Sequence, residues 1–246
     1  MPALEGKVAM VTGGSRGIGA AIALRLAQDG ADVAITYEKN RDRADETVAR
    51  IGELGRKAIA IQADSADAAA VTAAVGQAAS ALGGLDILVN NAGIFPRGTI
   101  GTLSLADIDR TLAVNVRSVF VAVQAALAHL GEGGRIITIG STLGERLPGP
   151  GMSLYAASKA ALSGLTRGLA RDLGPRGIAA VLVAPGPTDT DMNPADGPRA
   201  QQVLALSAIG RHAEPADIAA TVAHVAGPGG RFITGSTVTV DGGTNA

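Results

Sequence analysis

Two residues four positions apart, Tyr155 and Lys159, carry the side chains of this 246-residue sequence that are best suited to moving a proton. On a helix this spacing places both residues on one face. A phenol has an ordinary pKa of about 10 and is a poor acid or base at neutral pH, but a neighbouring cation would lower that pKa. Tyr155 would then protonate a carbonyl oxygen during reduction, or deprotonate an alcohol during oxidation. Ser141 ends the apolar run 136–140, and its hydroxyl would bond the developing oxyanion.

A glycine-rich segment near the beginning of the chain has the composition of a phosphate-binding turn. The run 12–19 reads Thr-Gly-Gly-Ser-Arg-Gly-Ile-Gly and follows the apolar residues 8–11. A strand that ends in closely spaced glycines and continues as a helix accepts a nucleotide diphosphate at the helix N-terminus. We expect Gly13 to permit a tight turn, Gly17 to let the backbone approach the phosphates, and Gly19 to let helix and strand pack closely. Together with the tyrosine–lysine pair, this segment predicts a nucleotide-dependent redox enzyme.

The elements that would position these residues alternate regularly along the chain. Short β-branched runs predict strands near 7–12, 32–36, 58–62, 85–90, 134–140, 178–183 and 237–240. Longer alanine-rich runs predict helices near 17–29, 41–54, 67–82, 104–130, 152–173 and 215–226. Strand–helix repetition of this kind indicates a parallel sheet covered on both faces by helices. We therefore predict an α/β, Rossmann-type doubly wound fold with seven parallel strands, and a single domain over residues 1–246.

One long irregular stretch, residues 184–200, interrupts this alternation and is rich in Pro, Gly and Asp. It follows the carboxyl end of a predicted strand, which is where ligands of open α/β sheets bind. Long loops in compact folds are usually functional. We predict a substrate lid at about 186–208. Its apolar wall would consist of Met192, Pro194, Leu204 and Leu206.

The composition excludes several other classes of protein. Hydrophobic residues make up 47% of the chain, aromatic residues only 2%, and the formal net charge is −1, which disfavours nucleic-acid binding. With no cysteine, the chain has no disulfide and no thiolate chemistry. We find no signal-peptide layout, no membrane-spanning run and no metal-ligand spacing, and we expect a cytoplasmic protein without a metal. His212 and His224 are interpreted as ordinary surface or core residues.

Several motifs in one order resemble the short-chain dehydrogenase/reductase family in its compact form of about 250 residues. The resemblance spans the chain from Lys7 to Gly243. Its motifs are the glycine loop, Asp64, Asn90-Asn-Ala-Gly93, Asn115, Ser141, Tyr155, Lys159, Pro185-Gly186 with Thr188, and Val240-Asp-Gly-Gly243. The resemblance implies the Rossmann-type fold and NAD(P)-dependent oxidoreductase activity on CH–OH or C=O groups. It says little about the substrate.

The resemblance also implies roles for individual residues. Ser141, Tyr155 and Lys159 would be catalytic, and Asn115 would hold a water that links Lys159 to solvent. Asp64 would bond the adenine amino group, and residues 91–93 would line the adenosine ribose. The implied cofactor-binding residues are Gly13, Ser15, Arg16, Gly17, Ile18, Gly19, Tyr37, Lys39, Asp64, Ser65, Asn91, Ala92, Gly93, Tyr155, Lys159, Pro185, Gly186 and Thr188. Without the family, Asn115 would equally suit a helix-bending amide, and Asp64 a turn or helix-capping residue.

The residues after the second predicted strand favour NADP over NAD. A reader of the NAD 2′-hydroxyl is an acid about 20 residues beyond the glycines, whereas Tyr37 occupies that place here. Arg16 lies inside the phosphate loop, and residues 39–41 add two cations and an amide that suit a 2′-phosphate. Glu38 argues against this, because its charge would repel the phosphate. Residues 38–43 would also make sense as an ordinary solvated charge run that begins a helix.

The expected activity is NADPH-dependent reduction of a small or medium-sized ketone, reversible as alcohol oxidation, with Tyr155 as proton donor. One alternative is a 3-oxoacyl-acyl-carrier-protein reductase. We disfavour it because Glu132 stands where a docking cation would help, although Arg176 is present. Another alternative is an NADP-sensing binding module without catalysis, against which the intact set of catalytic residues argues.

The expected partners are a small carbonyl or alcohol substrate and further copies of the chain. The family resemblance implies a homotetramer. The predicted helices 104–130 and 152–173 carry many small residues, which fit either contact between subunits or close packing on the protein's own sheet. The small residues of the second helix are Ala156, Ala160, Ala161, Ser163, Gly164 and Gly168.

Overall fold

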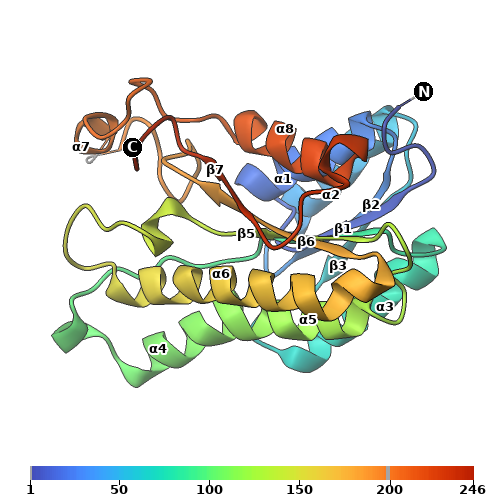
Figure 1. Cartoon of the computed structure of the whole chain (residues 1–246), viewed down its shortest axis with the longest axis horizontal. Helices are drawn as coiled ribbons and strands as arrows, with labels where there is room; N and C mark the ends of the chain where they lie inside the picture. The colour runs from blue at the N-terminus through green and yellow to red at the C-terminus, as the bar shows by residue number, and fades with distance from the viewer. Residues whose placement is uncertain (1, 198–199) are drawn as a thin grey trace.

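The computed structural model describes residues 2–197 and 200–246. Within these residues, seven strands form one parallel sheet with the order β3-β2-β1-β4-β5-β6-β7 (Figure 1). The strands are β1 (Val8–Val11), β2 (Asp32–Tyr37), β3 (Ala58–Gln62), β4 (Ile87–Asn90), β5 (Arg135–Ile139), β6 (Ala179–Pro185) and β7 (Thr237–Val240). The order reverses between β1 and β4, which creates the crevice at the carboxyl ends of the strands where nucleotides bind. The predicted doubly wound fold is confirmed.

Helices cover both faces of the sheet. One layer contains α1 (Gly17–Gln28), α2 (Arg41–Glu53) and α8 (Pro215–Ala226), and the other contains α3 (Ala68–Leu82), α4 (Leu105–Leu112), α5 (Ser118–Ala126) and α6 (Ser153–Leu173) (Figure 1). Because both faces are covered, residues of either orientation are buried in β1, β4, β5 and β6, whereas the edge strands β3 and β7 are mostly half-buried.

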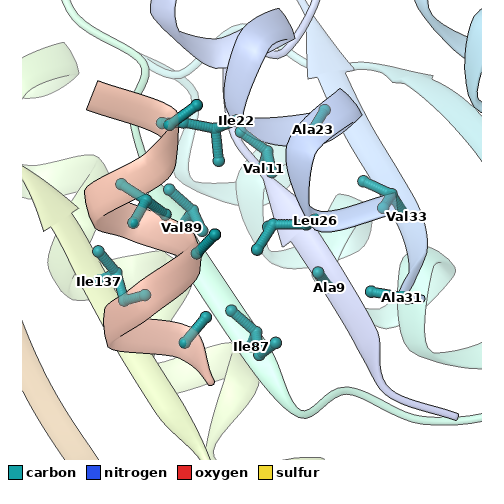
Figure 2. Close-up of a cluster of buried hydrophobic side chains, with 14 of the residues drawn as sticks. Ala9, Val11, Ile22, Ala23, Leu26, Ala31, Val33, Ile87, Val89 and Ile137 are labelled. Carbon is teal, nitrogen blue, oxygen red and sulfur yellow. The ribbon is translucent and has the colours of Figure 1, made fainter. Parts of the chain in front are cut away.

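The core beside α1 and α8 shows how this layer is held. Ile22 and Leu26 of α1 lie over Val11 and Val89 of the sheet, and the faint red helix α8 closes the same cluster (Figure 2). These side chains are fully buried. Burying a side chain of this size stabilises the fold by about 2 kcal/mol. The packing fixes the helix that follows the glycine loop.

The long helix predicted over 104–130 is instead divided into three parts. A capping box between Ser104 and Asp107 begins α4, a π-helical segment follows at Ala113–Arg117, and α5 ends at Ala126. The π segment contains Asn115, whose side-chain amide bonds the backbone of Ile94 in a neighbouring loop. A π segment adds one residue to a turn and is frequent at functional sites. The 3.6-residue periodicity of the sequence gave no indication of it.

The predicted lid has more local structure than its composition indicates. Thr188 forms a β-bridge with Ala213, Thr190 forms one with Asn193, and a short helix, α7, spans Ala200–Leu204. Residues 198 and 199 of the predicted lid lie outside the described residues. Among the helices that the structure describes, none is long and apolar enough to cross a membrane.

Candidate active site

A cavity of about 1240 Å³ lies at the carboxyl ends of the strands and gathers most of the predicted site residues. Those that line it are Gly13, Ser15, Arg16, Gly17, Ile18, Gly19, Tyr37, Asp64, Ser65, Asn91, Ala92, Gly93, Ser141, Tyr155, Lys159, Pro185, Gly186 and Thr188. Two predicted site residues, Lys39 and Asn115, do not line it. Lys39 is 86% exposed and pairs with Glu38 at 3.4 Å, so its ammonium extends into solvent. Asn115 is buried behind the cavity wall.

The glycine loop has the backbone geometry of a phosphate-binding turn. Gly13 and Gly17 have φ values of +66° and +54°, which residues with a Cβ rarely adopt. A Cβ on Gly19 would lie 2.2 Å from the Gly13 carbonyl oxygen and 2.5 Å from Asn91 Nδ2. Gly19 therefore allows the helix to pack closely against the turn and against Asn91, which directly follows strand β4. The first turn of α1 opens onto the cavity, where its free N–H groups suit an anion.

Asn91, which directly follows β4, supports this turn with hydrogen bonds. Its side-chain Nδ2 donates to the carbonyl oxygens of Thr12 at 3.0 Å and Gly13 at 3.1 Å, and its backbone N–H donates to the Thr12 hydroxyl at 3.0 Å. Both side-chain N–H groups are thus used inside the protein. Asn91 reaches the cavity wall mainly as a support of the phosphate loop.

Tyr155 and Lys159 lie on one face of α6 and meet Ser141 at the end of β5. Lys159 Nζ lies 5.8 Å from the centre of the Tyr155 ring and donates to the Ile139 carbonyl at 2.8 Å. Burial raises the pKa of Tyr155 more than the hydrogen bond from Ser141 lowers it. Burial also lowers the pKa of Lys159 to about 8. The net shift at Tyr155 is opposite to our expectation, because desolvation outweighs the stabilisation of phenolate, and it keeps the phenol protonated as a proton donor requires.

Asn115 connects the π segment to the helix that bears the tyrosine. Its Oδ1 accepts from the Ile94 N–H at 2.9 Å, and its Nδ2 donates to the Ile94 carbonyl and to Ser158 Oγ, each at 3.0 Å. Ser158 is fully buried and donates to the Tyr155 carbonyl at 2.7 Å. A Cβ on Gly93 would lie 3.4 Å from Asn115 Oδ1 and 3.6 Å from Lys159 Nζ, so only the slim backbone at Gly93 separates the amide from the ammonium.

The end of the cavity beyond the glycine loop contains charged residues from several elements. Arg16, which precedes α1, lies 3.4 Å from the lid carboxylate of Asp191. Glu38 follows β2 and Asp64 follows β3, and Arg110 of α4 contacts both acids. A backbone hydrogen bond from Ala66 and then the Arg110 guanidinium hold the pKa of Asp64 below its usual range. Asn40 and Arg41, the other expected phosphate partners, are used locally, as the cap of α2 and in an ion pair with Asp45.

Aromatic and apolar side chains lie around Tyr155, away from the charged residues. The Phe95 ring lies 4.2 Å from the Tyr155 ring, centre to centre, and the Arg97 guanidinium lies 4.5 Å from the centre of the Phe95 ring. Met192 and Leu206 of the predicted lid line the cavity. Pro194 and Leu204, predicted with them, do not.

Among the residues that line or support the site, the sequence analysis did not single out Phe95, Arg110, Ser158 and Asp191. Ser158 lies directly before Lys159, so its position alone was a usable signal. The other three depend on contacts between segments far apart in the chain, and a single sequence does not reveal such contacts.

Comparison with known proteins agrees with this geometry. The family model described as short chain dehydrogenase matches residues 7–201. A crystal structure of a short chain dehydrogenase from Burkholderia cenocepacia J2315 in complex with NADP is 65% identical, with a TM-score of 0.98, over 99% of this chain and 100% of that one. The cyclic-di-GMP-binding biofilm dispersal mediator protein of Escherichia coli K12 is 47% identical over 246 residues, the full length of both chains. The 3-oxoacyl-(acyl-carrier-protein) reductase FabG of Staphylococcus aureus is 39% identical over 240 residues, 96% of this chain and 97% of that one. The chain therefore belongs to the short chain dehydrogenase family of oxidoreductases.

Proposed function

We propose that this protein is an NADPH-dependent carbonyl reductase that runs in reverse as an alcohol dehydrogenase. The observation that carries the proposal is one continuous cavity, with a glycine loop at a helix N-terminus on one side and Ser141, Tyr155 and Lys159 farther along its wall. A phosphate-binding turn joined to a half-buried phenol beside a buried ammonium suits hydride transfer coupled to proton transfer.

The residues present fit a dinucleotide. Positive φ values at Gly13 and Gly17 open the turn for a pyrophosphate. Asp64, Ser65 and Arg16 line the same cavity, where the first two would contact the adenosine and Arg16 would supply a cation for a 2′-phosphate. The NADP complex of the Burkholderia relative supports the same cofactor. When bound, the reduced nicotinamide supplies the hydride.

In this proposal the protein positions the carbonyl and moves the proton. Ser141 donates a hydrogen bond to the carbonyl oxygen as negative charge develops there, and Tyr155 Oη transfers its proton to the same oxygen. The Lys159 ammonium lies close enough to stabilise the phenolate that remains. Tyr155 would regain its proton from solvent by way of Lys159, and Asn115, next to Lys159 across Gly93, is placed to hold the water that would link Lys159 to solvent.

Replacing Tyr155 with Phe tests the assignment of the acid. We expect the Tyr155→Phe variant to lose about 100- to 10,000-fold in kcat, which is the contribution of a positioned acid. Its NADPH affinity should stay within a few-fold. Turnover is followed by NADPH and NADH oxidation against ketones, β-ketoesters, diketones, quinones and an acetoacetyl thioester. Activity that survives in the variant would show that another group donates the proton.

A 3-oxoacyl-acyl-carrier-protein reductase is the second proposal within enzymes, and the FabG relative supports it. The guanidinium of Arg176 speaks against it, because it donates to the carbonyl oxygens of Leu127 and Leu130, each at 2.9 Å. Arg176 also precedes the amino end of β6, whereas the cavity lies at the carboxyl end. A large preference in kcat/KM for carrier-bound over free substrates would favour this function.

A nucleotide-sensing binding module is the proposal from another class. The Escherichia coli relative is known as a cyclic-di-GMP-binding protein, and a nucleotide binder among the relatives favours this candidate. Tight NADPH binding without turnover on any carbonyl of the panel would support it.

We also propose that the protein assembles as a homotetramer in the cytoplasm. Of the small residues on α6, Ala160, Ala161, Gly164 and Gly168 are exposed, and a Cβ on either glycine would meet no atom within 4 Å. Packing on the protein's own sheet accounts only for Ala156, which is buried. Contact between subunits accounts for the exposed ones.

A further inference from the structure

The acid that argued against NADP, Glu38, is not free in the folded protein. Its Oε1 lies 3.2 Å from Arg110 Nη2 and 3.4 Å from Lys39 Nζ. The Glu38 backbone is fixed as well, because Gln62 Nε2 donates to its carbonyl at 3.0 Å. The carboxylate is therefore directed toward α4 by a residue 72 positions away in the sequence.

Arg110 holds two acids at once. Its Nη1 lies 3.2 Å from Asp64 Oδ2 and its Nη2 lies 3.3 Å from Asp64 Oδ1, a two-pronged contact that fixes the plane of the guanidinium. Arg110 Nη2 also donates a hydrogen bond to Glu38 Oε1. With Lys39, the four side chains sum to zero charge, whereas without Arg110 the end of the cavity would carry one net negative charge.

The position of this network matters because Glu38 and Asp64 line the cavity together with Arg16, whereas Arg110 does not line it. The end of β2, which Glu38 follows, is where the 2′ position of the adenosine ribose is read. An unpaired carboxylate there would repel a 2′-phosphate dianion and favour a 2′-hydroxyl.

We propose that Arg110 is a specificity-determining residue, which makes this site compatible with NADP by pairing with Glu38 and turning its carboxylate toward α4. Arg110 acts through Glu38 and contacts no reacting atom, so it is a positioning residue. The inference rests on the proposed placement of the 2′-phosphate between Arg16 and Glu38.

Direct binding of NADPH and NADH to the full chain tests this without any need for turnover. In the Arg110→Met variant, Kd for NADPH should rise about fivefold, the effect of one partly screened charge, while Kd for NADH stays within twofold. Because the network is partly exposed, the effect should shrink in 1 M salt. Arg117→Met is the matched control, since Arg117 lies on the adjoining π segment and donates to the Ala66 carbonyl, with no acid as its partner in that hydrogen bond.

The decisive variant is the double substitution. Glu38→Gln in the Arg110→Met background should restore NADPH affinity to within twofold of wild type, because the repelling charge is gone. A loss of both cofactors alike, with no rescue by Glu38→Gln, would overturn the proposal and leave Arg110 as a support of Asp64. Unchanged affinities in Arg110→Met would overturn it as well. A separate Arg16→Met variant tests the underlying placement: if NADPH preference survives there, the 2′-phosphate binds elsewhere, and the role of Arg110 falls with that placement.

Discussion

At the scale of single residues, the protein keeps a cation where a cation is unfavourable. Lys159 is buried, and its ammonium donates to the Ile139 carbonyl but contacts no carboxylate among the salt bridges of the described residues. Burial lowers the pKa of Lys159 to about 8, because the folded state disfavours the charged ammonium. A residue retained at such a cost fits a functional role better than a structural one.

Replacing Lys159 with Met should stabilise the fold at neutral pH and abolish turnover. The pKa difference between 10.5 and about 8 corresponds to about 3 kcal/mol, and the lost hydrogen bond removes about 1 kcal/mol, which leaves a gain of about 2 kcal/mol. Below the folded pKa the cost is fully present. As the pH rises from 8 to 10.5, the unfolded chain holds more protons, so wild-type stability increases and the advantage of the variant disappears.

Urea unfolding at pH 7 and at pH 10 measures both chains at one protein concentration. Lys57→Met provides the control, because it makes the same chemical change at a lysine that is exposed. A Lys159→Met variant that is less stable than wild type at pH 7 would contradict the prediction. It would show that the ammonium is stabilised by more than its hydrogen bond to the Ile139 carbonyl.

At the scale of elements, the alternation of strands and helices was predictable because each element is specified locally. Apolar runs of β1 and β4 stop where the glycine motif and the Asn-Asn-Ala-Gly motif begin, and the Pro at position 215 begins α8. Contacts between elements were not predictable. Arg110 bonds Asp64 and Glu38 across 46 and 72 residues, and the π segment is determined by the fit of Asn115 to a distant loop. The single-domain organisation stays a prediction.

The contacts of the predicted lid were not predictable from the sequence either. Asp191 Oδ2 lies 2.6 Å from Arg43 Nη1 of α2 and 3.4 Å from Arg16 Nη1, so the first half of the lid is tied to the layer that contains the glycine loop. A Cβ on Gly17 would lie 3.4 Å from the Thr190 side chain, which places the lid directly over the loop. Hydrogen bonding from Arg43 lowers the pKa of Asp191, so this tie persists above pH 4 and is lost only in stronger acid.

Asp191→Asn should loosen this part of the lid. We expect amide hydrogen exchange over residues 188–197 to accelerate about threefold, while the sheet is unaffected. The KM for the substrate should also rise, because Met192, which follows Asp191 in the chain, lines the cavity. Asp196→Asn makes the same charge change at an exposed position five residues on. Equal exchange in the two variants would mean that the ion pairs do not restrain the lid.

At the scale of the whole molecule, two of the regions that expose large apolar side chains are candidates for contact between copies of the chain. Ile100, Leu105 and Phe120 are 79%, 78% and 46% exposed around α4 and α5, beside the exposed small residues of α6. Phe232, which is 100% exposed, lies just before β7 at the edge of the sheet. Two distinct apolar regions are what a tetramer with two kinds of two-fold interface requires.

Charged substitutions in these two regions should therefore split the tetramer first into dimers and then into monomers. We expect the wild-type chain to elute with four chain masses in size-exclusion chromatography with light scattering. Phe120→Glu and Phe232→Glu should each give two chain masses, because each places a charge in one kind of interface and leaves the other intact. The double variant should be a monomer. Leu54→Glu, at a 42% exposed leucine that follows α2, controls for the substitution itself and should stay tetrameric. A wild-type monomer at micromolar concentration, or a tetramer that survives both substitutions, would place the exposed apolar regions outside any interface between copies.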